Sequence, residues 1–160
     1  MENNLQSRKP LRLKGFDYGS KSHVYFVTLC TAERHPLFLE SKIAKTLEEE
    51  MEFRRAKKEI HLFCYCIMPD HLHLLFSLAD DYPKRMQDWV SAFKRYTAKK
   101  IFDLYELRPL WQKNFFDRIV RQEESLLQMA KYIIHNPVRK GIVSSWELYP
   151  YSKMADPLPL

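Results

Sequence analysis

The feature that most constrains this chain is the segment 68–76, MPDHLHLLF, in which two histidines one residue apart stand within an apolar run. Side chains alternate between the two faces of a β-strand, so a strand here places His71 and His73 on one face and the leucines around them on the other. Two imidazoles at this spacing can bind one divalent cation if a third ligand comes from elsewhere in the fold. The same pattern also occurs where two histidines are simply half buried, so the segment alone leaves both interpretations open.

The length and charge of the chain favour a single basic domain. Its 160 residues suit one domain with a sizeable core, and we expect a basic N-terminal arm over residues 1–20, one domain over 21–150 and a tail over 151–160. The chain has 26 Lys and Arg against 20 Asp and Glu. The resulting net charge of +6 favours a polyanionic partner such as nucleic acid.

Scarce residue types exclude several classes of protein. Three cysteines form neither a disulfide framework nor a four-ligand zinc set, and three glycines cannot make a phosphate-binding loop or a dinucleotide fingerprint. The first 15 residues are polar and basic, and no later segment has the length and hydrophobicity of a membrane span. We therefore expect a cytoplasmic protein with no membrane partner and no nucleotide cofactor.

Hydrophobic periodicity predicts an alternation of strands and helices. In chain order the predicted elements are a strand over 23–31, an amphipathic helix over 41–58, strands over 59–68 and 71–78, a helix that starts at Asp80, Asp81 and Pro83, a strand over 114–120, and a last helix that residues 122–124 open and Pro137 ends. A turn at Pro69 and Asp70 joins the strands over 59–68 and 71–78. Alternation along the second strand places Leu62 on the same face as Cys64 and Cys66.

This order of elements predicts the fold class. Strand, helix, strand, strand, helix, strand is the split β-α-β pattern of an α+β, ferredoxin-like antiparallel sheet, here with an extra C-terminal helix. In that topology the first and third strands are central, and the first two helices cover one face of the sheet. The imidazoles of His71 and His73 then point to the face that these helices leave open, and the extra helix is available to cover it.

The last helix offers a second group of polar side chains. Tyr132 and Asn136 are one turn apart, so they project together on one side of the helix. Alone, they are readily explained as a packing residue and a C-terminal capping residue. Combined with His71 and His73 they provide three neutral metal ligands and a phenol nucleophile. The apolar stripe on the other side comprises Leu126, Leu127, Ala130, Ile133 and Ile134.

At this point the chain resembles the single-tyrosine HUH transposases, in particular their REP-associated (RAYT) branch. The signature pieces are RLKGFDY at 12–18, YFVT at 25–28, MPDHLH at 68–73, LWQKNFFD at 110–117 and YIIHNP at 132–137. The similarity extends over most of residues 12–145. The histidine pair followed by the last two pieces in this order is a far more specific signal than any one piece.

The resemblance implies a function and a role for each site residue. His71 and His73 would be the metal ligands, Asn136 an additional ligand and Tyr132 the nucleophile on the C-terminal helix. The implied activity is cleavage and strand transfer of single-stranded DNA that contains a hairpin, through a covalent 5′-phosphotyrosine, with Mg²⁺ or Mn²⁺ as cofactor. The protein would act in the cytoplasm at the nucleoid, and the sequence leaves open whether it is a monomer or a homodimer.

Basic residues close in sequence to these elements are candidate phosphate contacts, because uniform positive charge suits a DNA backbone. A solvated helix face explains the same charges on α-helical segments. The candidates are Arg12, Lys14, Lys94, Arg95, Lys99, Lys113, Arg118 and Arg121.

Two other functions are compatible with parts of the sequence. A non-catalytic module that binds single-stranded RNA or DNA could stack bases on Tyr25, Phe63 and Tyr65 of a ferredoxin-like sheet. That interpretation gives the histidine pair no use. A phosphodiesterase with two histidine motifs would need a repeat of the first motif, and the other histidines do not supply one.

Overall fold

A computed structural model describes residues 23–160, so the predicted arm over residues 1–20, with Arg12 and Lys14, lies outside the described residues. The helices and strands in chain order are β1 (Val24–Cys30), α1 (Ser41–Ala56), β2 (Ile60–Met68), β3 (His71–Leu78), α2 (Met86–Tyr105), β4 (Phe116–Val120), α3 (Glu123–Ile134), α4 (Asn136–Arg139) and β5 (Ser152–Met154). Short 3-10 turns occur at η1 (Ala32–Arg34), η2 (Leu37–Leu39) and η3 (Trp146–Leu148).

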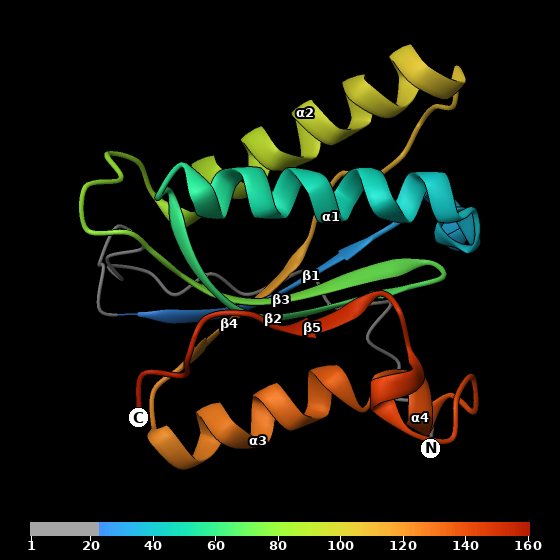
Figure 1. Cartoon of the computed structure of the whole chain (residues 1–160). Helices are drawn as coiled ribbons and strands as arrows, with labels where there is room; N and C mark the ends of the chain where they lie inside the picture. Colours follow the sequence, from blue (N-terminus) through green and yellow to red (C-terminus); the bar gives the residue numbers. More distant parts are fainter. Residues whose placement is uncertain (1–22) are drawn as a thin grey trace.

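The five strands form one antiparallel sheet in the order β4-β1-β3-β2-β5. Helices α1 and α2 lie together over one face of the sheet, and α3 and α4 lie under the other face (Figure 1). The first and third strands are central, which confirms the ferredoxin-like α+β prediction and the extra C-terminal helix. The sheet is therefore the middle layer of three.

The alternation of β3 assigns its side chains to two separate cores. Leu72, Leu74 and Phe76 pack with β1, α1 and α2 residues in one buried cluster. His71, His73 and Leu75 point to the opposite face, where Leu75 joins the cluster covered by α3. Because α3 supplies an apolar stripe to that face, the imidazoles lie between the sheet and the C-terminal helices, as the sequence predicts. Leu127 was wrongly placed in that stripe, since it is exposed.

Strand β2 contains a bulge that the alternation rule did not predict. The pairing with β3 shifts between Leu62 and Cys64, so Phe63 is an extra residue. As a result Leu62 faces α1 and α2, whereas Cys64 and Cys66 face α3. The prediction that Leu62 shares a face with the two cysteines is therefore wrong.

Helix α2 begins later than predicted. Asp80, Asp81 and Pro83 lie in a turn, and the helix starts at Met86 after Arg85. The Arg85 backbone N–H donates to the Asp88 carboxylate at 3.3 Å, which caps the first turn. Local capping thus determines the start, rather than the earlier acidic pair.

Pro137 separates two helices instead of only ending one. Helix α3 ends at Ile134, and Asn136 is the first residue of the short helix α4, with Pro137 in its first turn. Proline suits this position because its missing N–H would have no helical partner there. Tyr132 and Asn136 therefore belong to two helices and not to one.

The predicted tail over residues 151–160 instead contributes an edge strand. Ser152–Met154 pair with Cys64–Cys66 of β2. The Asp156 carboxylate then accepts a hydrogen bond from the Leu62 N–H at 2.8 Å and two from the Arg55 guanidinium at 2.6 and 2.9 Å. These contacts join the C-terminal segment to both β2 and α1.

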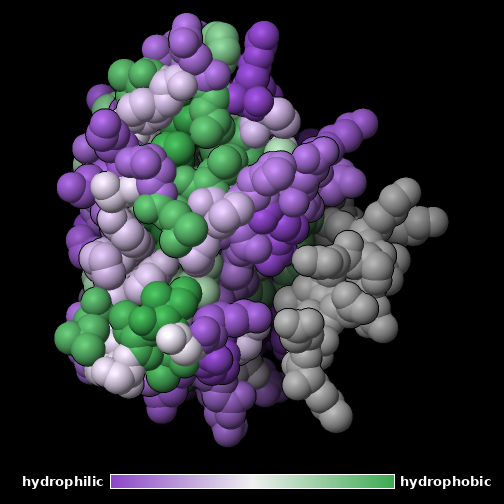
Figure 2. All heavy atoms as spheres, turned by 90° about the vertical axis from the view of Figure 1, so that its right-hand side faces the viewer, coloured by the Kyte–Doolittle hydropathy of each residue, from purple (hydrophilic) through white to green (hydrophobic). Residues whose placement is uncertain are grey.

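The surface is mixed in character. Seen from the side on which α4 lies in Figure 1, hydrophobic groups are separated by hydrophilic ones (Figure 2). The exposed apolar side chains include Leu39, Ile142 and Leu148. Among the described residues no helix has both the length and the hydrophobicity needed to cross a membrane.

Asp156→Ala should lower the free energy of unfolding by about 1–3 kcal/mol, because it leaves the Leu62 N–H without an acceptor and leaves Arg55 only its contact with Glu52. Lys153→Ala removes only an exposed pair with Glu52 and should cost less than about 1 kcal/mol. Urea unfolding of both variants measures the difference.

The pH dependence provides a further check on the same variant. In the wild-type protein the hydrogen bond from Arg55 to Asp156 holds the pKa of the Asp156 carboxyl group below its ordinary value of 3.8. A carboxyl group whose pKa is lower in the folded protein than in the unfolded chain stabilises the fold at pH values above its unfolded pKa. This stabilisation is lost as the pH falls through the folded pKa. The difference between wild type and Asp156→Ala should therefore shrink below about pH 4, and a constant difference would contradict this role.

Candidate active site

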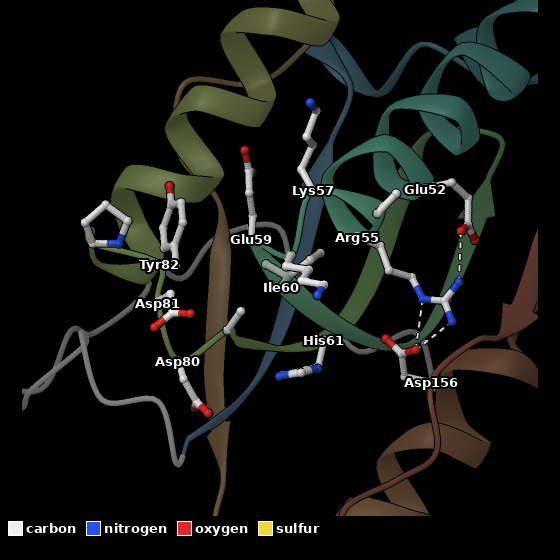
Figure 3. Close-up of a pocket in the computed structure, with 14 residues that line it drawn as sticks. Glu52, Arg55, Lys57, Glu59, Ile60, His61, Asp80, Asp81, Tyr82 and Asp156 are labelled. Atoms are coloured by element: carbon white, nitrogen blue, oxygen red, sulfur yellow. Dashed lines mark hydrogen bonds and ion pairs between the residues drawn. The ribbon is translucent and has the colours of Figure 1, made fainter.

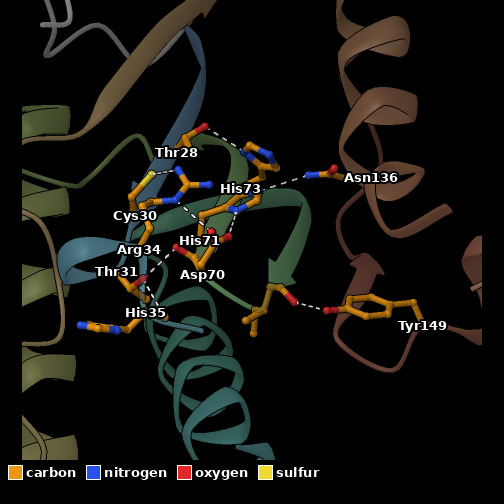
Figure 4. A network of polar contacts seen from close by, with 11 residues as sticks. Thr28, Cys30, Thr31, Arg34, His35, Asp70, His71, His73, Asn136 and Tyr149 are labelled. Carbon is orange, nitrogen blue, oxygen red and sulfur yellow. Dashed lines mark hydrogen bonds and ion pairs between the residues drawn. The ribbon is translucent and has the colours of Figure 1, made fainter. Parts of the chain in front are cut away.

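His71 and His73 lie side by side on β3, with ring centroids 4.6 Å apart. Both are buried between the sheet and the C-terminal helices. His71 Nδ1 lies 2.7 Å from the Asp70 carboxylate, and His73 Nδ1 lies 2.8 Å from the Thr28 hydroxyl (Figure 4). A hydrogen bond on Nδ1 fixes the orientation of each ring and leaves Nε2 of both rings for another partner.

The environment of His73 favours the neutral imidazole. Burial lowers the pKa of His73 well below its ordinary value, and the neighbouring His71 and the cations Arg139 and Arg34 lower it further. A neutral ring retains a nitrogen lone pair, which is the form in which histidine binds a metal.

Asn136 approaches the histidine pair from α4. Its amide nitrogen is 3.2 Å from His71 Nε2, and the side chain is buried. Figure 4 shows this contact bridging from the helical layer to β3. The oxygen and the nitrogen of an amide occupy similar positions on the same carbon. A rotation of the Asn136 amide by 180° would therefore place its oxygen where the nitrogen now lies.

Tyr132 lies beside the second histidine. Its ring centroid is 6.1 Å from that of His73 and 6.3 Å from that of Phe26, and the side chain is 41% exposed. The structure therefore brings Tyr132, Asn136, His71 and His73 together, with the phenol at the solvent side and the amide at the buried side.

Arg34 supports the histidine pair through Asp70, the residue directly before β3. Arg34 donates to the Asp70 carboxylate at 2.9 Å while Asp70 also contacts His71. Burial alone would raise the pKa of Asp70, but the hydrogen bond and charge of His71, with Arg34, lower it to about 2. Glu33 and Arg34 both adopt left-handed backbone angles, with φ of 52° and 58°, in the turn that directs Arg34 toward Asp70.

The predicted DNA-contacting cations are divided between the two sides of the sheet. Arg118 pairs across strands with Phe26, so it lies on the α3 face, and its side chain is exposed. Arg95 and Lys99 are exposed on α2, on the other face, and Lys99 is paired with Asp103 at 2.6 Å. Figure 1 shows that the sheet separates α2 from α3.

Lys94 has a structural partner. Its Nζ donates to the carbonyl oxygens of Gln112 and Lys113 at 2.7 and 3.1 Å, and burial lowers its pKa. This amine therefore organises the loop before β4. Lys113 is exposed on that loop, and Arg121 is exposed just after β4.

The aromatic residues that could have served an RNA-binding module are not accessible. Tyr25 and Tyr65 are buried under α1 and α2, and Phe63 is buried under α3. Base stacking needs exposed rings, so these three residues form no stacking platform.

A broad depression of about 1070 Å³ lies at the other end of β3 (Figure 3). Its wall carries charges of both signs, including Arg55, Lys57, Asp80 and Asp81. None of the four predicted active-site residues lines it. The side chains that could carry out a reaction are therefore those of the histidine, tyrosine and asparagine group.

Sequence reasoning missed four residues around this group. Thr28, Asp70 and Arg139 contact its members, and Arg34 contacts Asp70. Asp70 directly precedes His71 and was assigned only to a turn. Arg139 lies just beyond the YIIHNP segment, and its guanidinium carbon lies 4.1 Å from the centroid of the Tyr132 ring. Spacing from known site residues was the available signal for both.

The chain is similar in sequence to known transposases. A Haemophilus influenzae relative, provisionally named a REP-associated tyrosine transposase, is 29% identical over 148 residues, covering 83% of this chain and 80% of its own. The ISDra2 transposase TnpA of Deinococcus radiodurans is 28% identical over 133 residues, covering 78% of this chain and 91% of its own.

A solved structure has the same fold. It is a REP-associated tyrosine transposase bound to a REP hairpin, with a TM-score of 0.67 and 20% identity, covering 88% of this chain and 82% of that one. Residues 20–136 match the family described as IS200-like transposases. The chain therefore belongs to the IS200-like transposase family of DNA-cleaving tyrosine transposases.

Proposed function

We propose that this transposase cleaves and transfers single-stranded DNA beside a hairpin, with Tyr132 as the nucleophile. The observation that carries the proposal is the approach of Tyr132 to His73 and of Asn136 to His71 from two helices that cover the same face of the sheet. The relatives support the DNA substrate, because one of them is bound to a REP hairpin.

The donor set fits a divalent cation. We propose that Nε2 of His71, Nε2 of His73 and the Asn136 oxygen hold Mg²⁺ or Mn²⁺. The Nδ1 contacts with Asp70 and Thr28 support this assignment, because a ring that donates its Nδ1–H to either oxygen carries its lone pair on Nε2. Such a cation supplies Lewis acidity to an oxygen of the scissile phosphate.

The covalent step conserves the phosphodiester energy. The Tyr132 Oη–P bond forms as the P–O3′ bond breaks, so the phenolic proton is released and the departing 3′ oxygen gains a proton. The products are a 5′-phosphotyrosine and a free 3′-hydroxyl. Attack by a second 3′-hydroxyl on the phosphotyrosine reverses the bond changes and joins the strands.

The DNA path follows the α3 side of the sheet. We propose that Lys113, Arg118 and Arg121 contact phosphates there, because the exposed Arg118 shares that face with Phe26 and the tyrosine site. Arg95 and Lys99 would contact the DNA only if the DNA strand also extended to α2. Lys94 is assigned to the loop that it already holds.

Tyr132→Phe should abolish the covalent adduct and retain the fold, because only a partly exposed hydroxyl is removed. Tyr96→Phe is the matched control, since Tyr96 is exposed on α2 across the sheet. The measurement uses a pool of DNA hairpins with randomised stems and flanks, labelled at the 3′ end, followed by denaturing electrophoresis. An adduct formed by Tyr132→Phe, or none formed by wild type, would contradict the proposal.

His73→Ala should stop cleavage while leaving hairpin binding largely intact, because phosphate contacts come from Lys and Arg. His71→Ala should behave in the same way. Excess EDTA should stop wild-type cleavage, and Mn²⁺ should raise the melting temperature of wild type and not of His73→Ala. Full cleavage in EDTA would remove the cation from the proposal.

Arg118→Gln should weaken hairpin binding and reduce the slope of log Kd against log salt by nearly one unit. Lys42→Gln is the control, since Lys42 is an exposed cation on α1 on the other side of the sheet. Binding titrations over a range of salt concentrations measure both slopes. Equal slopes for Arg118→Gln and wild type would exclude Arg118 as a phosphate contact.

A further inference from the structure

We propose that Arg139 is a catalytic residue that binds a non-bridging oxygen of the scissile phosphate next to Tyr132. The inference rests on the proposed tyrosine cleavage and adds a residue to it. Its starting point is the position of the Arg139 guanidinium carbon, 4.1 Å from the centroid of the Tyr132 ring. Six other cation–ring pairs within residues 23–160 are wider, with distances of 4.8 to 6.0 Å.

The backbone around Arg139 is held in place. Arg139 is the last residue of α4, and its N–H donates to the His135 carbonyl at 3.0 Å. Gly141 adopts a φ of 71°, its N–H donates to the Val138 carbonyl, and the Ile142 N–H donates to the Pro137 carbonyl. This is a Schellman arrangement, so the end of α4 is closed by defined hydrogen bonds.

One short helix therefore presents two different groups to the site. Asn136, at its start, is buried against His71, whereas Arg139, at its end, is exposed over Tyr132. The Tyr132 ring has Arg139 close to it as well as the rings of Phe26 and His73. Arg139 thus occupies the solvent side of the nucleophile, where DNA has access.

The charge of Arg139 is available for a ligand. Within residues 23–160 no ion pair or hydrogen bond holds its guanidinium. By contrast, Arg34, Arg54 and Arg55 are each bound to a carboxylate.

The chemistry of phosphoryl transfer suits such a group. Negative charge is spread over the non-bridging oxygens as the Oη–P bond forms and the P–O3′ bond breaks. A guanidinium is always protonated and presents planar N–H groups that match phosphate oxygens, so it stabilises this charge without transferring a proton. The guanidinium carbon lies 4.1 Å from the centroid of the phenol ring, so these N–H groups are close to the side chain that carries the attacking oxygen.

The first test compares Arg139→Gln, Arg139→Lys and a matched control, Lys131→Gln. Lys131 is an exposed cation on α3 next to Tyr132 and has no role in the proposal. Arg139→Gln should slow single-turnover adduct formation on the hairpin pool by about 10²–10³-fold, with only a few-fold change in Kd. Arg139→Lys should be intermediate, because it keeps the charge and loses the planar fork. Lys131→Gln should match wild type.

The second test separates contact with the phosphate from a purely structural effect on Tyr132. Sulfur replaces each non-bridging oxygen of the scissile phosphate in turn, in a hairpin selected from the pool. One stereoisomer should slow wild type in a way that Mn²⁺ does not rescue, and the same isomer should have a much smaller effect on Arg139→Gln and Arg139→Lys. Melting temperatures of the variants verify that they are folded.

The outcomes are distinguishable. If wild type forms the adduct and Arg139→Gln reacts as fast as Lys131→Gln, Arg139 is not catalytic while the tyrosine mechanism stands. Equal sulfur effects in wild type and both Arg139 variants would also overturn the phosphate contact. If wild type forms no adduct, the proposed function fails and this inference fails with it.

Discussion

The position of β3 between β1 and β2 is the constraint on which the rest of this structure depends. A central strand is covered on both faces, so both sets of its alternating side chains must be buried. The leucine face requires only apolar partners. The imidazole face requires hydrogen-bonding partners as well, because a buried polar group without one costs about 1–3 kcal/mol. Thr28, Asp70 and Asn136 satisfy this requirement, and Arg34 in turn satisfies Asp70.

The fold was predictable where a local period recurs over many residues. The alternation of β3 and the helical spacing of residues 41–58 determined the layers and the strand order. The prediction from two-residue alternation failed at Phe63 in β2. A bulge there moves the neighbouring side chains to the other face of the sheet, and no change in residue type marks it. Strand β5 could not be predicted, since three residues carry no period and their partner, β2, is distant in sequence. The role of Pro137 as a helix start also depends on the conformation of the residues after it.

The active site was predictable only for residues whose spacing places them together on one element or in a family signature. His71, His73, Tyr132 and Asn136 meet that condition. Thr28 also lies in a signature piece, but its contact with His73 depends on the pairing of β1 with β3, and Arg34 reaches the site only through a turn outside any signature piece. The predicted cations show a related limit. Sequence gives the sign of Lys94 and Arg95, but the sheet places them on the side away from α3, and Lys94 is occupied by two carbonyl groups.

The turn that supports Asp70 exposes a conflict between stability and activity. Glu33 and Arg34 are consecutive non-glycine residues in the left-handed region, a conformation that costs about 1–2 kcal/mol for each. Glycine would adopt both conformations freely, but at position 34 it would remove the cation that Asp70 requires, and at position 33 it would loosen the turn. Glycine at position 34 would therefore relieve backbone strain and at the same time release the Asp70 carboxylate that orients His71, so this turn retains strain in exchange for an ordered site.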